Sequence, residues 1–205
     1  YIEGCSGNDF AIFGTKYVAE VLKKSLSNLL VDELKNSNET LIKKKVFIDK
    51  FEEVLDNVHE KSVKRYFDVL VQILRNAPEN MIVPLGSCHG DLTLSNIIYT
   101  KDGKVILIDF LKTYLESPLQ DIAKLTQDFK YKWSFRRSSR AVQTKGGIFL
   151  GAAIPEILSK MSEKYKEQAI IFEMLNLLRI APYLRDDATE AWLIKSLDAF
   201  KQEYI

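Results

Sequence analysis

Hydrophobic residues recur every three or four positions along most of the chain. The first such run covers residues 18–34 and follows a possible helix cap at Thr15. Two shorter runs, at 47–58 and 63–74, repeat the pattern. This spacing places an apolar face along a helix, so it predicts three amphipathic helices in the first part of the chain. The glycines and the Asn-Asp pair within residues 1–13 instead favour a loop.

The pattern changes to short apolar runs in the middle of the chain. Residues 97–99 and 105–108 flank a turn sequence that contains Gly103, which predicts a β-hairpin. Helical spacing returns after Ser117-Pro118, a typical helix start because proline suits the first helical position. Further helices are expected at 148–161, 169–184 and 192–204.

These elements predict an α+β fold that is mostly α-helical, with one small hairpin. The segment 170–178 is apolar nearly all round, which is typical of a helix at the centre of a core. We expect one unit over residues 1–205, divided into a linker (1–13), helices (14–78), a loop with the hairpin (82–111) and a helical part (117–205).

Composition and charge narrow the class of protein. The 29 basic and 28 acidic side chains nearly cancel, which argues against broad binding to nucleic acid or to a membrane surface. The two cysteines lack the spacing of a zinc or redox site, and reduced thiols are the simpler interpretation. No apolar run reaches the roughly 18 residues that a membrane span needs. We therefore predict a soluble, cytoplasmic protein.

Three polar residues around the hairpin suggest chemistry. Asn96 precedes the first strand of the hairpin and Asp109 follows the second, so both side chains can reach one ion. Magnesium prefers oxygen ligands, and an Asn carbonyl with an Asp carboxylate supplies them. Asp91, five residues before Asn96, could take the proton of an attacking hydroxyl. This set predicts magnesium-assisted phosphoryl transfer. Chance occurrence in an α-rich domain is the alternative, and the conjunction of spacing and strand signals argues against it.

Three neighbouring residues are expected to support this loop. His89, two residues before the proposed base, is more typical of a hydrogen-bonded brace than of a group that titrates during turnover. Gly90 would allow backbone geometry that a Cβ obstructs. Asp121 could accept backbone N–H groups of the loop, or it could be an ordinary exposed acid on a helix.

These residues resemble the aminoglycoside phosphotransferase and choline kinase superfamily, the small-molecule branch of the kinase-like fold. Residues 89–98 are similar to its catalytic loop, 108–110 to its metal-binding motif, and 117–123 to the segment that follows. The resemblance implies that Asp91 is the base, that Asn96 and Asp109 bind magnesium, and that Asp121 supports the loop. The sequence departs from the protein-kinase pattern in having Leu after Asp-Phe, which leaves the metal role intact.

The resemblance extends to the first residues of the chain. Residues 1–4 are similar to the hinge between the two kinase lobes, so Tyr1 and Ile2, together with Ile108, are implied to bind the nucleotide, ATP or GTP. The chain then corresponds to the C-terminal lobe of the fold. The phosphate-covering loop and the lysine of the other lobe are not in this sequence, so we expect the chain alone to turn over poorly.

The acceptor is less clearly indicated. By the resemblance it is a hydroxyl of a sugar, amino alcohol or aminoglycoside. Six basic residues and no acid lie within residues 130–145, and through Arg136 and Arg137 this segment could bind an anionic acceptor. A solvated basic loop is an equal alternative, and nucleic-acid contact a weaker one. A second hypothesis for the whole chain is a non-catalytic nucleotide-binding or protein-interaction module, a pseudokinase, although such a module has no need of the base.

Overall fold

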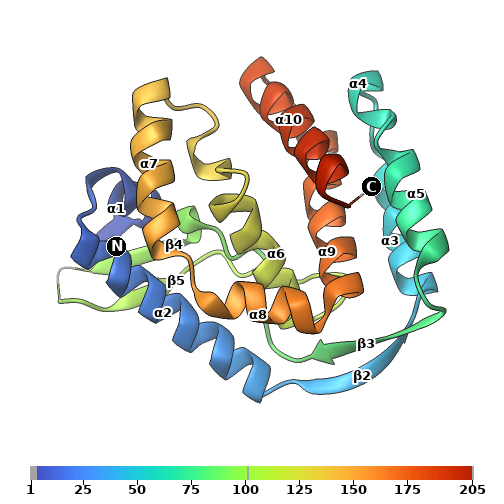
Figure 1. Cartoon of the computed structure of the whole chain (residues 1–205), viewed down its shortest axis with the longest axis horizontal. Coiled ribbons are helices and arrows are strands. Elements are labelled where there is room, and N and C mark those ends of the chain that lie inside the picture. The colour runs from blue at the N-terminus through green and yellow to red at the C-terminus, as the bar shows by residue number, and fades with distance from the viewer. Residues whose placement is uncertain (1–3, 101, 205) are drawn as a thin grey trace.

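The structure, a computed structural model, describes residues 4–100 and 102–204. Helices dominate it and two small antiparallel sheets flank them, which confirms the predicted α+β class (Figure 1). The first half contains β1 (Gly4–Ser6), α1 (Gly7–Phe13), α2 (Lys16–Lys35), β2 (Asn38–Lys43), α3 (Lys45–Asp56), α4 (Lys61–Lys64), α5 (Phe67–Asn76) and β3 (Asn80–Leu85). The second half contains β4 (Ile97–Thr100), β5 (Val105–Leu107), α6 (Pro118–Phe129), α7 (Arg140–Ala153), α8 (Glu156–Lys164), α9 (Lys166–Leu178) and α10 (Asp187–Tyr204).

Local sequence signals account for the helix starts that were predicted. The Thr15 hydroxyl accepts a hydrogen bond from the Val18 amide at the start of α2, and the Ser117 hydroxyl accepts one from Leu119 at the start of α6. Proline follows Ser117 at the first helical position. Both helices were placed correctly because their caps and their apolar spacing agree.

The predicted loop over residues 1–13 was wrong for residues 4–13. β1 pairs with β4, with Cys5 opposite Tyr99, and extends the predicted hairpin into a three-stranded sheet. Ser6 then caps α1 by accepting a hydrogen bond from the Asp9 amide. The strand depends on a partner more than ninety positions away, and the short helix depends on its cap. The prediction was wrong because it relied on glycine content alone.

A second sheet was also missed. β2 pairs with β3 in antiparallel register, with Thr40 opposite Val83, and this two-stranded ribbon lies at the bottom of Figure 1. The basic run 43–45 spans the end of β2 and the start of α3. The helix predicted over 148–161 is in fact two helices, because Pro155 lies between α7 and α8 and cannot donate a backbone hydrogen bond.

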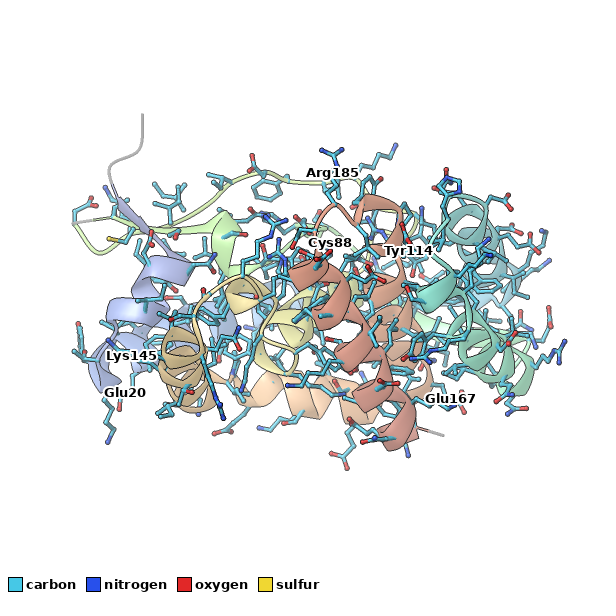
Figure 2. All side chains as sticks on the ribbon, turned by 90° about the horizontal axis from the view of Figure 1, so that it is seen from above. Glu20, Cys88, Tyr114, Lys145, Glu167 and Arg185 are labelled. Carbon is cyan, nitrogen blue, oxygen red and sulfur yellow. The ribbon has the colours of Figure 1, made fainter. Side chains whose placement is uncertain are left out.

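The core forms around α9, as its sequence predicted. Every residue from Ile171 to Leu178 is buried, and α6 packs against this helix. The three-stranded sheet and the α3–α5 helices lie at opposite ends of the long axis (Figure 1). The view from above shows Glu20 and Lys145 near the first end and Glu167 toward the other (Figure 2). Among the residues that the structure describes, no helix is long and apolar enough to cross a membrane.

Candidate active site

The segment between β3 and β4 carries most of the residues predicted to act in chemistry, and α6 holds it in place. The buried carboxylate of Asp121 accepts hydrogen bonds from the backbone amides of His89, at 2.5 Å, and Gly90, at 2.8 Å. Asp121 is fully buried, so it is not the exposed helix acid that its sequence position also allowed. Two charge-assisted hydrogen bonds that one carboxylate accepts fix the start of the loop.

His89 connects the loop to the end of the hairpin. Its Nε2 donates to the Ile108 carbonyl at 2.7 Å, and its Nδ1 accepts from the Asp91 amide at 3.3 Å. Both ring nitrogens are thus engaged in hydrogen bonds within the protein. The ring is 1% exposed and stacks on Phe110, with centroids 4.4 Å apart. This arrangement gives His89 a positioning role and leaves its ring no free nitrogen for proton transfer.

Gly90 occupies a position that requires glycine. Its φ is +81°, and a Cβ there would lie 1.9 Å from the Leu111 carbonyl oxygen. The loop and the segment after β5 therefore approach each other more closely than any side chain would permit.

The carboxylate of Asp91 contacts two side chains, one through each oxygen. Its Oδ1 lies 2.9 Å from the Lys124 ammonium, and its Oδ2 accepts from Asn96 Nδ2 at 3.0 Å. The same Asn96 nitrogen also donates to the Asp91 carbonyl at 2.8 Å. The side chain of Asp91 remains 33% exposed, so its oxygens have lone pairs accessible to a ligand.

Asn96 and Asp109 fit the donor set that magnesium prefers. The amide nitrogen of Asn96 is used by Asp91, and no residue that the structure describes donates a hydrogen bond to its carbonyl oxygen. Asp109 is exposed and has a φ of +59°, a strained conformation for a residue with a Cβ. Such strain is common at functional sites. The described residues contain no cluster of three or more His, Cys, Asp or Glu side chains able to hold a metal, so a magnesium ion here would need oxygens from phosphate or water.

Lys124 and Asp128 are two site residues that sequence reasoning missed. The buried carboxylate of Asp128 accepts from the Leu94 amide at 2.7 Å and from the Ser134 amide at 2.8 Å. Together with Asp121, they follow an i, i+3, i+7 spacing, which places all three on one face of α6. The sequence did contain a signal for these residues. They are charged, yet they recur at the spacing of buried positions in a helix that begins with a strong cap.

The carboxyl group of Glu33 also contacts Asp121. Burial, the negative charge of Asp121 and a side-chain hydrogen bond to it raise the pKa of Glu33 to about 9. Because Asp121 already accepts two backbone hydrogen bonds, we assign the shared proton to Glu33. The brace of the loop is therefore a carboxylic acid and carboxylate pair at neutral pH.

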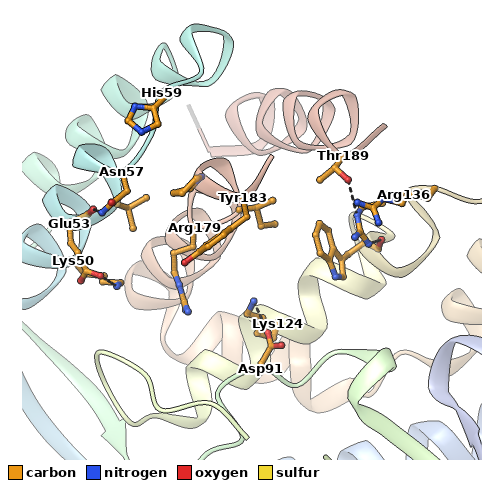
Figure 3. A pocket seen from close by; sticks show the side chains of 15 residues that line it. Lys50, Glu53, Asn57, His59, Asp91, Lys124, Arg136, Arg179, Tyr183 and Thr189 are labelled. Atoms are coloured by element: carbon orange, nitrogen blue, oxygen red, sulfur yellow. Dashed lines mark hydrogen bonds and ion pairs between the residues drawn. The ribbon is translucent and has the colours of Figure 1, made fainter. Parts of the chain in front are cut away.

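A cavity of about 780 Å³ opens beside Asp91 and Lys124 (Figure 3). Both arginines predicted to bind substrate line it. Arg136 lies 3.5 Å from the centre of the Trp133 ring, while Arg137 pairs with Asp186. The other basic residues of the segment do not line this cavity. Lys130 instead pairs with two glutamates, and Arg140 and Lys145 are exposed on α7.

The residues implied to bind the nucleotide are only partly described. Tyr1 and Ile2 lie outside the described residues. Ile108 is half-buried, and its carbonyl accepts the hydrogen bond from His89.

Comparison with known families supports a kinase-like chain. The model of the family described as "Ecdysteroid kinase-like family" matches residues 7–126, more than half of the 205 residues. The matched range contains the loop, the hairpin and most of α6. The match is not specific to aminoglycoside phosphotransferases. A search of curated proteins gave no match.

Proposed function

The chain belongs to the ecdysteroid kinase-like family, and from this premise we propose that it carries the catalytic site of an ATP-dependent phosphotransferase acting on a hydroxyl group of a small molecule. The observation that carries the proposal is the position of Asp91. Its carboxylate faces the cavity and is fixed by Asn96, whose carbonyl oxygen remains available beside it. The proposed base and one proposed metal ligand thus lie on the same loop, and the cavity opens beside the base.

In this proposal the acceptor lies in the cavity and donates a hydrogen bond to Asp91. Its oxygen forms a bond to the γ-phosphorus of ATP as the bond between that phosphorus and the bridging oxygen of ADP breaks, and the hydroxyl proton passes to Asp91. Asn96 and Asp109 would hold magnesium, which when bound neutralises charge on the nucleotide phosphates. His89, Asp121 and Asp128 keep the loop in place and touch no reacting atom.

Lys124 adds a cation at the point of transfer. Its ammonium is only 2.9 Å from Asp91, so it lies within reach of a phosphoryl group that approaches an acceptor oxygen held by that carboxylate. A fixed cation stabilises charge that develops on the moving phosphoryl group. We therefore assign Lys124 a role in charge stabilisation.

The proposed acceptors are alcohols of a size that the cavity admits. Ligand cavities of 300–1,000 Å³ suit drug-sized molecules, and this one falls within that range. Sugars, amino alcohols and aminoglycosides remain candidates. The name of the family adds ecdysteroids, which are polyhydroxylated steroids.

The proposal is tested by a screen of the full-length protein with magnesium and ATP, and GTP in parallel. Neutral sugars, sugar phosphates and uronic acids, amino alcohols, aminoglycosides and 20-hydroxyecdysone serve as acceptors, and mass spectrometry detects products that have gained one phosphoryl group. We expect a product from at least one class and its loss when EDTA removes the metal. Nucleotide binding without any product would instead favour the non-catalytic module.

A further inference from the structure

We propose that the acceptor carries an anionic group, a carboxylate, sulfate or phosphate ester, and that Arg179 binds it. This inference rests on the proposed function, because it assumes that the cavity beside Asp91 receives the acceptor. It adds a substrate class and a binding residue that lies outside the basic segment 130–145.

The charges that line the cavity are unbalanced. Five of its lining residues are basic and two are acidic. The basic ones are Lys50, Lys124, Arg136, Arg137 and Arg179. A concave site lined by an excess of one charge concentrates ligands of the opposite charge.

Most of these cations already have partners within the protein. Lys50 pairs with Glu53 at 2.7 Å, Lys124 pairs with Asp91, and Arg137 pairs with Asp186. Arg136 stacks on Trp133 and donates to its carbonyl at 3.1 Å and to Thr189 at 3.3 Å. The Arg137–Asp186 pair is partly exposed to solvent, so water and the carboxylate already satisfy the Arg137 guanidinium.

Arg179 differs from the other four. Its Nη1 is shielded from solvent, yet it donates no hydrogen bond to any residue that the structure describes. The residue follows the last turn of α9, and Figure 3 shows its guanidinium directed into the cavity between Lys50 and Lys124. A buried charged donor without an acceptor is costly, and a carboxylate or phosphate oxygen would satisfy it.

The positions of Arg179 and Asp91 indicate a ligand with two functional groups. Both residues line the same cavity, Asp91 beside Lys124 at one side and Arg179 further along (Figure 3). A molecule bound there can present a hydroxyl to Asp91 while its anionic group contacts Arg179. The guanidinium would then orient the acceptor as well as select it, because a planar donor pair matches a carboxylate or phosphate in two places.

The test compares two ligands that differ in one group, p-nitrophenyl β-D-glucuronide and p-nitrophenyl β-D-glucoside. Calorimetric titration of the full-length protein without nucleotide measures the affinity of each. We expect the glucuronide to bind about tenfold more tightly, because one additional charge-assisted hydrogen-bonded pair lowers the binding free energy by an amount of that order. Arg179→Gln should remove this preference by weakening the glucuronide alone. The matched control is Arg140→Gln, since Arg140 is exposed on α7 and outside the cavity.

Equal affinity for the two ligands, or no binding of the glucuronide, would overturn the inference. So would a preference that persists in a folded Arg179→Gln protein. Should that variant fail to fold, Arg179→Lys provides the readout, because it keeps the charge and loses the planar donor pair: a reduced preference supports the inference and an unchanged one contradicts it. Since these titrations need no phosphoryl transfer, an anion preference without any product in the screen would refute only the proposed function.

Discussion

Asp121 meets three groups at once: the backbone amides of His89 and Gly90 and the carboxyl group of Glu33. A buried carboxylate normally has to be compensated by several donors, and here a protonated acid serves as one of them. The proton on Glu33 is therefore part of the structure that holds the loop between β3 and β4.

This pair predicts a pH dependence of stability. The pKa of Glu33 is raised to about 9 in the folded protein, from 4.5. Between these values the unfolded chain releases the proton and the folded chain retains it, so the free energy of unfolding falls as pH rises through this window. Glu33→Gln keeps a donor for Asp121 without the titration. We expect its melting temperature to exceed that of the wild type at pH 8 by about 2–4 °C, on the order of 1 kcal/mol.

The measurement is a set of thermal melts between pH 5 and pH 9. The advantage of Glu33→Gln should be small at pH 5 and should grow with pH. Glu20→Gln, an exposed glutamate on the same helix, serves as the control and should follow the wild type. Parallel curves for Glu33→Gln and the wild type would mean that Glu33 does not hold the proton.

Gly90 and Gly103 form a matched pair for a second prediction. Their φ angles are nearly equal, +81° and +80°, but a Cβ on Gly90 would collide with the Leu111 carbonyl while one on Gly103 would meet nothing within 4 Å. Gly103→Ala should cost about 1 kcal/mol of unfolding free energy for the strained φ alone. Gly90→Ala should cost at least about 2 kcal/mol more, since backbone must move. Denaturant titration of both variants decides this, and equal losses would contradict the close approach.

At the scale of elements, α6 contributes residues both to the fold of the loop and to the proposed reaction. One face of this helix presents Asp121 and Asp128 to backbone amides of the loop and Lys124 to the proposed base. The sequence indicated the helix through its cap and indicated Asp121 through a resemblance. It did not indicate Lys124, because the spacing shows only that three charged residues share one face of the helix, and does not show that this face meets a loop thirty positions earlier.

Lys124→Met separates the two roles of this helix. The substitution keeps the aliphatic stem and removes the charge, so we expect the melting temperature to change little and kcat to fall about 10²-fold or more with the acceptor found in the screen. Lys124→Arg should recover part of the loss. Lys145→Met, on the exposed side of α7, is the control. Full activity of Lys124→Met would show that Lys124 does not stabilise charge during phosphoryl transfer.

At the scale of the whole molecule, the sequence was sufficient where local and tertiary preferences agree. The long helix α2, the hairpin of β4 and β5 and the buried α9 all follow from apolar spacing and caps. β1 and the β2–β3 ribbon escaped prediction because each depends on a partner distant in sequence.

The site was predictable to a similar degree. The loop residues stand out because their chemical types follow one another at fixed spacing. The cavity and Arg179 do not stand out, since they arise only when the end of α9 is packed beside the segment after α6. Binding specificity depends on this packing, so it cannot be predicted from the sequence motifs alone.

The most direct test of the central claim is the effect of Asp91→Asn in the full-length protein. Single-turnover phosphoryl transfer to the acceptor from the screen should slow by about 10²–10⁴-fold, while the dissociation constant of magnesium-ATP, measured by calorimetry, should stay within about threefold. The Asn side chain keeps the size of the carboxylate but cannot accept the proton of the attacking hydroxyl. Transfer at the wild-type rate by Asp91→Asn would show that another group is the base and would contradict this account.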